Sequence, residues 1–306
     1  MSSLQILKRA LVRGLLTLWI VISVIFFSIR LIPGGPFDSE IALSPEVRQT
    51  LEERYYLNRP LPQQYYHFVK GVLRFDFGSS TRYQNDYPIV KIVIDGLIVS
   101  GAIGSIAFFL ACLGSLLAAV VTVSYPHGYV AWVLNIATRF GVSVPSFIFG
   151  AAMIYIFSER FKLLPPALLQ GPSSYILPSL TLAYRPFSIL YRGLRESISK
   201  ELNQKYVRTA FGKGLSIENV VFIHILPNAA LSLLGLFGIL FSHLVTGSFV
   251  IENMFALPGL GKYFVTSILD RDYALIIMTF SVYAVILIFI NQVSEFISDR
   301  WLTGEK

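Results

Sequence analysis

Cysteine and charge are both scarce in this sequence of 306 residues. Its single cysteine, Cys112, lies in an apolar run, so the chain itself can form neither a disulfide framework nor a Cys-x-x-Cys metal or redox site. Charged residues make up only 14% of the chain, against 54% hydrophobic residues and a mean hydropathy of +0.63. This composition excludes an ordinary water-soluble domain and predicts an integral membrane protein.

Motifs for catalysis are also missing. The phosphate-binding pattern Gly-x4-Gly-Lys-[Ser/Thr] fails at Gly261–Lys262, because Ala256 stands at the first glycine position and Tyr263 follows the lysine. The sequence contains no His-Glu-x-x-His motif, and no Ser–His or Ser–Lys pair can be identified in it, so we expect no catalytic residue and no metal site. We therefore expect a chain that is not an enzyme and binds no cofactor. The four histidines are scattered, at His67, His127, His224 and His243.

Apolar segments long enough to cross a bilayer dominate the chain and predict an all-α fold with six transmembrane helices. Pro145 is expected to kink the third segment, and the small residues of the second predict close helix packing. The second, fifth and sixth segments carry no carboxylate, which argues against ion-driven transport. The six segments are Leu11–Leu31, Gly96–Val123, Trp132–Ser158, Tyr175–Leu194, Ala229–Ile251 and Ala274–Ser294.

Charge indicates which loops face the cytoplasm. The N-terminal tail is basic, whereas Pro33–Lys91 is balanced, so the positive-inside rule places the tail inside and the loop outside. Arg192–Pro227 has a basic surplus and is expected inside, as are both termini. The net charge of +7 then needs no nucleic acid partner. The expected parts are a tail 1–10, a first helix 11–31, an extracytoplasmic loop 32–94 and a five-helix core 95–306 with a cytoplasmic loop 195–228.

Arg185 lies near the middle of the fourth segment and allows two interpretations. A charge at that depth is costly, so the side chain is expected to face a polar cavity such as a translocation path. Alternatively, the boundary of the segment lies a turn away and Arg185 extends to the interface.

Tyr206–Pro227 is a polar segment between two apolar spans. Glu201 and Lys205 have the spacing of a helical ion pair leading into this segment, and Gly214 can end that helix in the left-handed conformation. Ser216 can cap a second helix, in which Ile217, Val220, Val221 and His224 recur at helical spacing. Such a helix pair fits either a rigid element moved by a separate ATPase or an interfacial hairpin without a partner.

The spacing of this segment resembles the EAA loop of binding-protein-dependent ABC importer permeases, Glu-Ala-Ala-x3-Gly-x9-Ile-x-Leu-Pro. Ala210, Gly214, Leu226 and Pro227 match it, whereas Arg208, Thr209 and His224 depart from it. The variants Arg208–Thr209–Ala210 and Lys213–Gly214–Leu215 resemble the dipeptide and oligopeptide permease branch.

Further matches follow in order along the chain. Leu31–Pro36 resembles the Leu-Ile-Pro-Gly-Asp-Pro of that branch, and Phe75–Ser80 resembles its Gly-Asp-Leu-Gly-x-Ser. Pro258–Gly261 and Arg271–Tyr273 resemble the external stretch before the last span, whereas Ser298–Arg300 lacks the usual proline. The long first external loop is similar to that of the B-type subunit.

The resemblance implies a type I importer fold in the bacterial inner membrane, in which this chain and a second, unlike permease form the pore. Two partner ATPases would bind ATP and Mg²⁺, and an extracytoplasmic solute-binding protein would deliver a peptide. The residues expected to contact the ATPase are Tyr206, Arg208, Thr209, Ala210, Lys213, Gly214, Leu215, His224, Leu226 and Pro227, and those expected to face the binding protein are Asp76, Gly78, Pro258, Gly259, Gly261, Arg271 and Asp272. A membrane scaffold or receptor and an ion-driven transporter are the alternatives.

Overall fold

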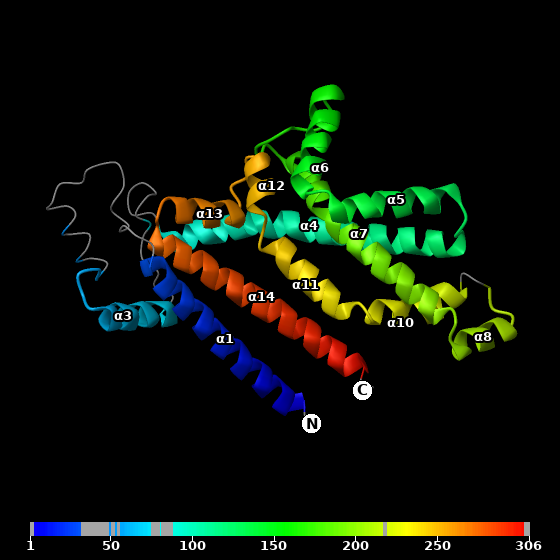
Figure 1. Ribbon diagram of the computed structural model, residues 1–306, viewed down its shortest axis with the longest axis horizontal. Helices are drawn as coiled ribbons and strands as arrows, with labels where there is room; N and C mark the ends of the chain where they lie inside the picture. Colours follow the sequence, from blue (N-terminus) through cyan, green and yellow to red (C-terminus); the bar gives the residue numbers. More distant parts are fainter. Residues whose placement is uncertain are drawn as a thin grey trace. The chain divides into compact units, whose positions relative to one another are not determined.

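A computed structural model describes residues 3–31, 49, 53, 56–74, 80, 88–216 and 219–302 of the chain. Every regular element formed by these residues is a helix, as the composition predicts (Figure 1). The chain divides into two compact units, Met1–Leu97 with Leu260–Val285, and Ile98–Gly259 with Ile286–Lys306. Helices α4 (Ile89–Ser124) and α14 (Tyr273–Leu302) contribute to both.

The first unit contains α1 (Ser3–Leu31), α3 (Leu61–Leu73) and α13 (Leu260–Leu269), with parts of α4 and α14. Aromatic side chains attach α3 to α1: the Phe26 ring lies 5.2 Å from that of Tyr65 and 4.9 Å from that of Phe68, between centroids. Arg30 adds a hydrogen bond of 2.9 Å from its Nε to Gln64. This part of the segment between the first two apolar spans therefore folds against α1.

The second unit is built around α7 (Ile176–Glu201). Its buried face, which includes Leu190, Tyr191, Leu194 and Ile198, packs inside the unit, and α5 and α6 lie beside it. The other helices of this unit are α5 (Tyr129–Ser143), α6 (Ser146–Met153), η1 (Ile154–Arg160), η2 (Pro172–Tyr175), α8 (Lys205–Gly212), η3 (Val220–Ile225), α10 (Leu226–Leu231), α11 (Leu234–Val245) and α12 (Phe249–Met254).

Small residues allow α4 and α11 to approach closely. A Cβ atom at Gly104 would collide with the backbone of Leu244, and Ala107 and Ala111, on the same face of α4, are fully buried. The packing predicted from the small residues of the second apolar segment is confirmed here.

Four helical segments of the described chain are long and apolar enough to span a membrane: Leu11–Leu31, Ile89–Ser124, Leu234–Met254 and Tyr273–Ser298. The third predicted span is not a kinked helix but a broken one, with α5 and the helical stretch Ser146–Arg160 at 117° to one another. Val144 is extended because it precedes Pro145. Counting the broken pair gives five spans. Helix α7 is long but more polar, so six spans remain a prediction.

Candidate coupling site

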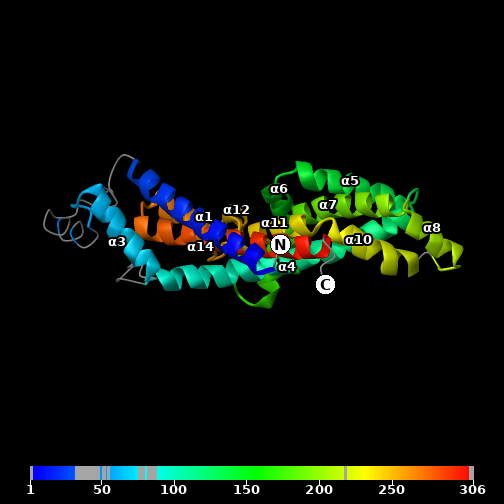
Figure 2. The same cartoon turned by 90° about the horizontal axis from the view of Figure 1, so that it is seen from below.

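The polar segment predicted at Tyr206–Pro227 begins where α7 ends. Gln204 is extended, with φ −72° and ψ 150°, and separates α7 from α8. The prediction that Glu201 and Lys205 pair along one helix is wrong, because this break places them in different helices. The Glu201 carboxylate instead accepts a hydrogen bond of 2.5 Å from the Tyr206 hydroxyl. Figures 1 and 2 show α8 beyond the end of α7 and near α10.

Helix α8 has one buried and one exposed face. Val207 and Ala210 are buried in a cluster with Val220, Val221 and Ile225 of η3. The opposite face presents exposed side chains of mixed character, namely Arg208, Thr209, Phe211 and Lys213. The inner face thus fixes α8 to the core, and the outer face is available to another molecule.

The turn after α8 is a Schellman motif centred on Gly214. The Gly214 N–H donates to the Phe211 carbonyl at 2.9 Å, and the Leu215 N–H donates to the Ala210 carbonyl at 3.4 Å. Gly214 has φ +80°, the left-handed conformation predicted from the sequence. Ser216 Oγ then accepts from the Asn219 N–H at 3.4 Å, which confirms the predicted helix cap. Ile217 and Glu218 lie outside the described residues.

In the second helix, Asn219 is already helical and the π-helical turn η3 follows it. The hydrogen bonds of a π-helix join residues five apart, and Val220 and Ile225, which have this separation, are both fully buried. His224 is half-buried, and its carbonyl accepts from Asn228 Nδ2 at 2.9 Å and lies 3.4 Å from the Tyr206 hydroxyl oxygen. Leu226 is half-buried, and the exposed Pro227 lies within the continuous helical stretch Val220–Leu231, shortly after the π-helical turn.

Tyr206 of α8 links this helix to α7 before it and to η3 and α10 after it. Its hydroxyl contacts Glu201, the His224 carbonyl and Asn228 Nδ2. Burial, and then the hydrogen bond to the Glu201 carboxylate, raise the pKa of Tyr206 above its usual value. The hydroxyl therefore remains protonated at neutral pH and keeps its role as donor.

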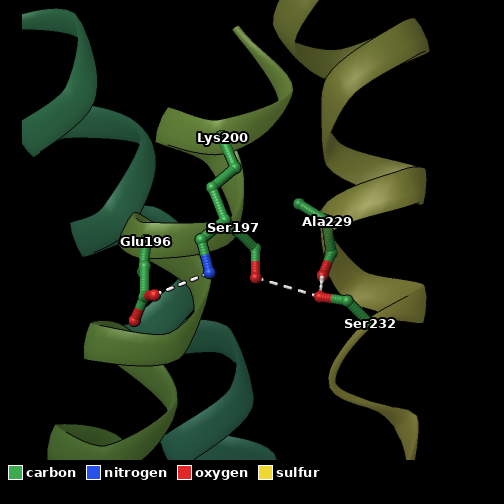
Figure 3. Close-up of polar contacts among 5 residues, drawn as sticks. All are labelled: Glu196, Ser197, Lys200, Ala229 and Ser232. Carbon is green, nitrogen blue, oxygen red and sulfur yellow. Dashed lines mark hydrogen bonds and ion pairs between the residues drawn. The ribbon is translucent and has the colours of Figure 1, made fainter. Parts of the chain in front are cut away.

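A second contact connects α7 with the chain that follows α10. Figure 3 shows Ser197 of α7 facing Ser232, which follows α10, with their hydroxyl oxygens 2.9 Å apart. The Ser232 hydroxyl also contacts the Ala229 carbonyl, at 2.7 Å, and Ala229 is fully buried. We call Lys205–Leu231 the coupling segment. The Ser197–Ser232 contact connects α7 with the residue that follows α10, so the chain is held together on both flanks of this segment.

The residues predicted to face a binding protein differ in exposure. Pro258 is exposed and Arg271 is partly exposed, whereas Gly259, Gly261 and Asp272 are buried. Asp272 Oδ1 accepts from the Leu275 N–H at 3.1 Å in the first turn of α14, and its Oδ2 accepts from the Ser80 hydroxyl. Its carboxylate is thus engaged within the chain. Asp76 and Gly78 lie outside the described residues.

Arg185 is exposed on α7, and Pro186, next to it, is buried within the helix. An exposed side chain fits both interpretations of this residue, because a pore and the membrane interface both lie outside the packed core.

Sequence reasoning missed Glu252, because the predicted fifth span stops at Ile251 and the helical segment continues to Met254. Glu252 is buried, and its Oε1 accepts from the Ser100 hydroxyl at 2.7 Å and the Ser248 N–H at 3.2 Å. A Cβ atom at Gly247 or Gly259 would collide with the Glu252 side chain. We call Ser100, Gly247, Glu252 and Gly259 the Glu252 cluster. The sequence signal for it is a carboxylate flanked by two glycines.

Comparisons with known proteins agree with the motif spacing. Residues 111–301 match the family described as binding-protein-dependent transport system inner membrane component. The chain is 36% identical to the dipeptide transport system permease protein of Bacillus subtilis, over 89% of this chain and 88% of the relative. It is 33% identical to the oligopeptide transport system permease protein of Haemophilus influenzae, over 95% and 96%.

A solved structure shares the fold. The crystal structure of an amino acid ABC transporter with histidines matches with a TM-score of 0.54 and 16% identity, over 69% of this chain and 94% of that chain. Since the family match covers more than half of the chain and the two permeases cover most of it, the chain belongs to the binding-protein-dependent transport system inner membrane components, the permeases of ABC importers.

Proposed function

We propose that this chain forms one half of the pore of an ATP-driven importer of dipeptides or oligopeptides. It spans the bacterial inner membrane six times with both termini in the cytoplasm. A second, unlike permease completes the pore, two ATPase subunits bind ATP and Mg²⁺, and an extracytoplasmic binding protein delivers the peptide. The names of the relatives at 33% and 36% identity support the substrate class.

The two-faced geometry of α8 carries this proposal. Its inner face is packed against η3, and its outer face presents Arg208, Phe211 and Lys213 to the exterior. Closure of the ATPase pair would displace α8, and the Tyr206 and Ser197–Ser232 contacts would pass that displacement to the membrane helices. The chain thus acts as a two-state element biased by ATP binding elsewhere.

Reconstitution in vesicles with the cognate ATPases, partner permease and binding protein tests the function. We expect peptide to accumulate inside vesicles when ATP is supplied on the cytoplasmic side. Binding without accumulation would identify a scaffold or receptor. Accumulation driven by an ion gradient without the ATPases would identify a secondary transporter.

Reversing the charge at Arg208 tests the outer face of α8. Arg208→Glu should lower ATP-driven uptake about tenfold, because an ATPase surface that complements a cation would repel the new carboxylate. Buried charged contacts between proteins are worth roughly 1–3 kcal/mol or more. Arg208→Lys, which keeps the charge, should retain most of the uptake. The measurement is uptake together with co-purification of the ATPases. Normal co-purification of the ATPases and normal uptake in the Arg208→Glu variant would show that Arg208 does not contact the ATPase.

Removing one hydroxyl tests the internal connection. Tyr206→Phe deletes the contacts to Glu201, the His224 carbonyl and Asn228 but keeps the ring. We expect uptake to fall about two- to fivefold at unchanged ATPase binding, since one such hydroxyl contributes about 1 kcal/mol. Tyr125→Phe, which removes the hydroxyl of an exposed tyrosine outside the coupling segment, is the matched control. An equal effect of both changes would contradict a specific role of Tyr206.

A further inference from the structure

A basic cavity lies between α5 and the C-terminal part of α7 in the second unit. It has a volume of about 600 Å³, within the range of ordinary small-ligand sites. Four cationic side chains and one carboxylate line it, Arg139, Arg192, Arg195, Lys200 and Glu196. The lining is therefore strongly cationic. None of its residues takes part in the contacts described for the coupling segment.

The cations of this cavity differ in their partners. Lys200 pairs with Glu196 at 2.7 Å on the solvent-exposed rim, which Figure 3 shows along α7. Arg195 is half-buried and donates through Nη1 to Asn135 Oδ1 at 2.8 Å, so a neutral amide fixes its direction. Within the described part of the chain, no carboxylate pairs with Arg139 or Arg192. Two guanidinium groups are thus available for an oxyanion.

The Asn135 amide makes this arrangement rigid. Its Oδ1 also accepts from the buried Tyr191 hydroxyl at 3.0 Å. Tyr191 belongs to the packed core of α7, so the amide and the Arg195 guanidinium are held in place before any ligand arrives. Arginine guanidinium groups match the geometry of phosphate oxygens and bind them bidentately.

The surroundings of the cavity indicate the source of that phosphate. In the first turn of α5, the exposed rings of Tyr129 and Trp132 stack with centroids 5.9 Å apart. Exposed tyrosine and tryptophan mark the headgroup level of a bilayer. Ile136 and Phe140, also exposed on α5, provide an apolar surface for acyl chains close to Asn135 and Arg139. A soluble anion would gain nothing from this apolar surface, whereas a phospholipid would bind the guanidinium groups with its phosphate and the apolar surface with its acyl chains.

We propose that this cavity binds the phosphate headgroup of an anionic phospholipid of the cytoplasmic leaflet. The inference requires the cytoplasmic placement of the α7 end proposed above, but it requires no transport activity. Arg139 and Arg192 hold the phosphate, Arg195 supports it from the position set by Asn135, and the acyl chains lie along Ile136 and Phe140. Basic pockets between membrane helices on the cytoplasmic side have the electrostatic character that selects anionic headgroups.

Lipid binding to the transporter purified with its partner subunits tests this site. Native mass spectrometry and thermal unfolding would compare added phosphatidylglycerol, phosphatidylcholine and inorganic phosphate. We expect phosphatidylglycerol to bind at least tenfold more tightly than the other two and to raise the unfolding temperature. The double variant Arg139→Gln/Arg192→Gln should weaken phosphatidylglycerol binding at least fivefold.

The control variant Lys8→Gln/Arg13→Gln removes the same charge from the N-terminal helix and should leave this binding unchanged. An equal loss in both double variants would overturn the site, because the effect would then reflect net charge alone. Equal binding of inorganic phosphate would overturn the lipid as the source of the oxyanion. Absence of any lipid preference in the assembled complex would show that a partner subunit covers the cavity, and would also overturn the proposal.

Discussion

Replacing Gly214 with valine is expected to reduce ATP-driven uptake roughly tenfold while the chain remains inserted and assembled. Gly214 has φ +80° and closes the Schellman turn after α8. The left-handed conformation costs an L-residue roughly 1–2 kcal/mol, and a β-branched side chain is least suited to it. The turn then opens or shifts, and α8 loses the fixed direction through which it would move α7 and α10.

The structure supplies a matched control at the same position. Among the described residues, and apart from its two chain neighbours, no atom lies within 4 Å of a Cβ built on Gly214, so the backbone conformation is what the substitution tests. Asparagine tolerates the left-handed region, so Gly214→Asn should retain most of the uptake. Uptake and ATP hydrolysis in reconstituted vesicles are the measurements. Equal activity of the valine and asparagine variants would contradict a role for this turn in coupling.

Much of this site could be predicted because its signals are local. A glycine that ends a helix and a serine that begins the next act on backbone groups within a few residues, so Gly214 and Ser216 were placed correctly. The break at Gln204 was missed, since the Glu201–Lys205 spacing favours a continuous helix and the Tyr206 contact that replaces it depends on tertiary structure.

Features that depend on distant partners were not predictable in the same way. Ser197 and Ser232 are far apart in the sequence, and neither carries a signal that would pair them. Pro145 predicted a kink, but the 117° change of direction depends on how the pieces pack against α7. Four of the six predicted apolar spans overlap helical segments that are long and apolar enough to cross a bilayer, because a bilayer imposes helix length and composition on each segment separately.

Replacing Gly259 with alanine is expected to destabilise the second unit strongly, because the added methyl group has no room. The added Cβ would collide with the Glu252 carboxylate and lie 2.7 Å from the Ser100 hydroxyl. Neither group can withdraw easily, because Ser100 bonds to Glu252 at 2.7 Å and both are almost fully buried. Overpacking of this kind costs roughly 1–3 kcal/mol, and displacing a buried carboxylate from its donors adds a similar amount.

A double-mutant cycle separates this collision from a general loss of stability. Glu252→Ala alone should also destabilise the chain, because it leaves the Ser100 hydroxyl and the Ser248 N–H without this acceptor. In the Glu252→Ala background, however, Gly259→Ala should cost less than half of its effect in the unmodified chain, since the obstructing carboxylate is gone. Gly235→Ala is the control, because no atom of the described residues outside its own helical turn lies within 4 Å of its Cβ and alanine favours a helix. Thermal unfolding of the purified complex measures all four changes, and additive effects of the two substitutions would show that Gly259 and Glu252 do not act through direct contact.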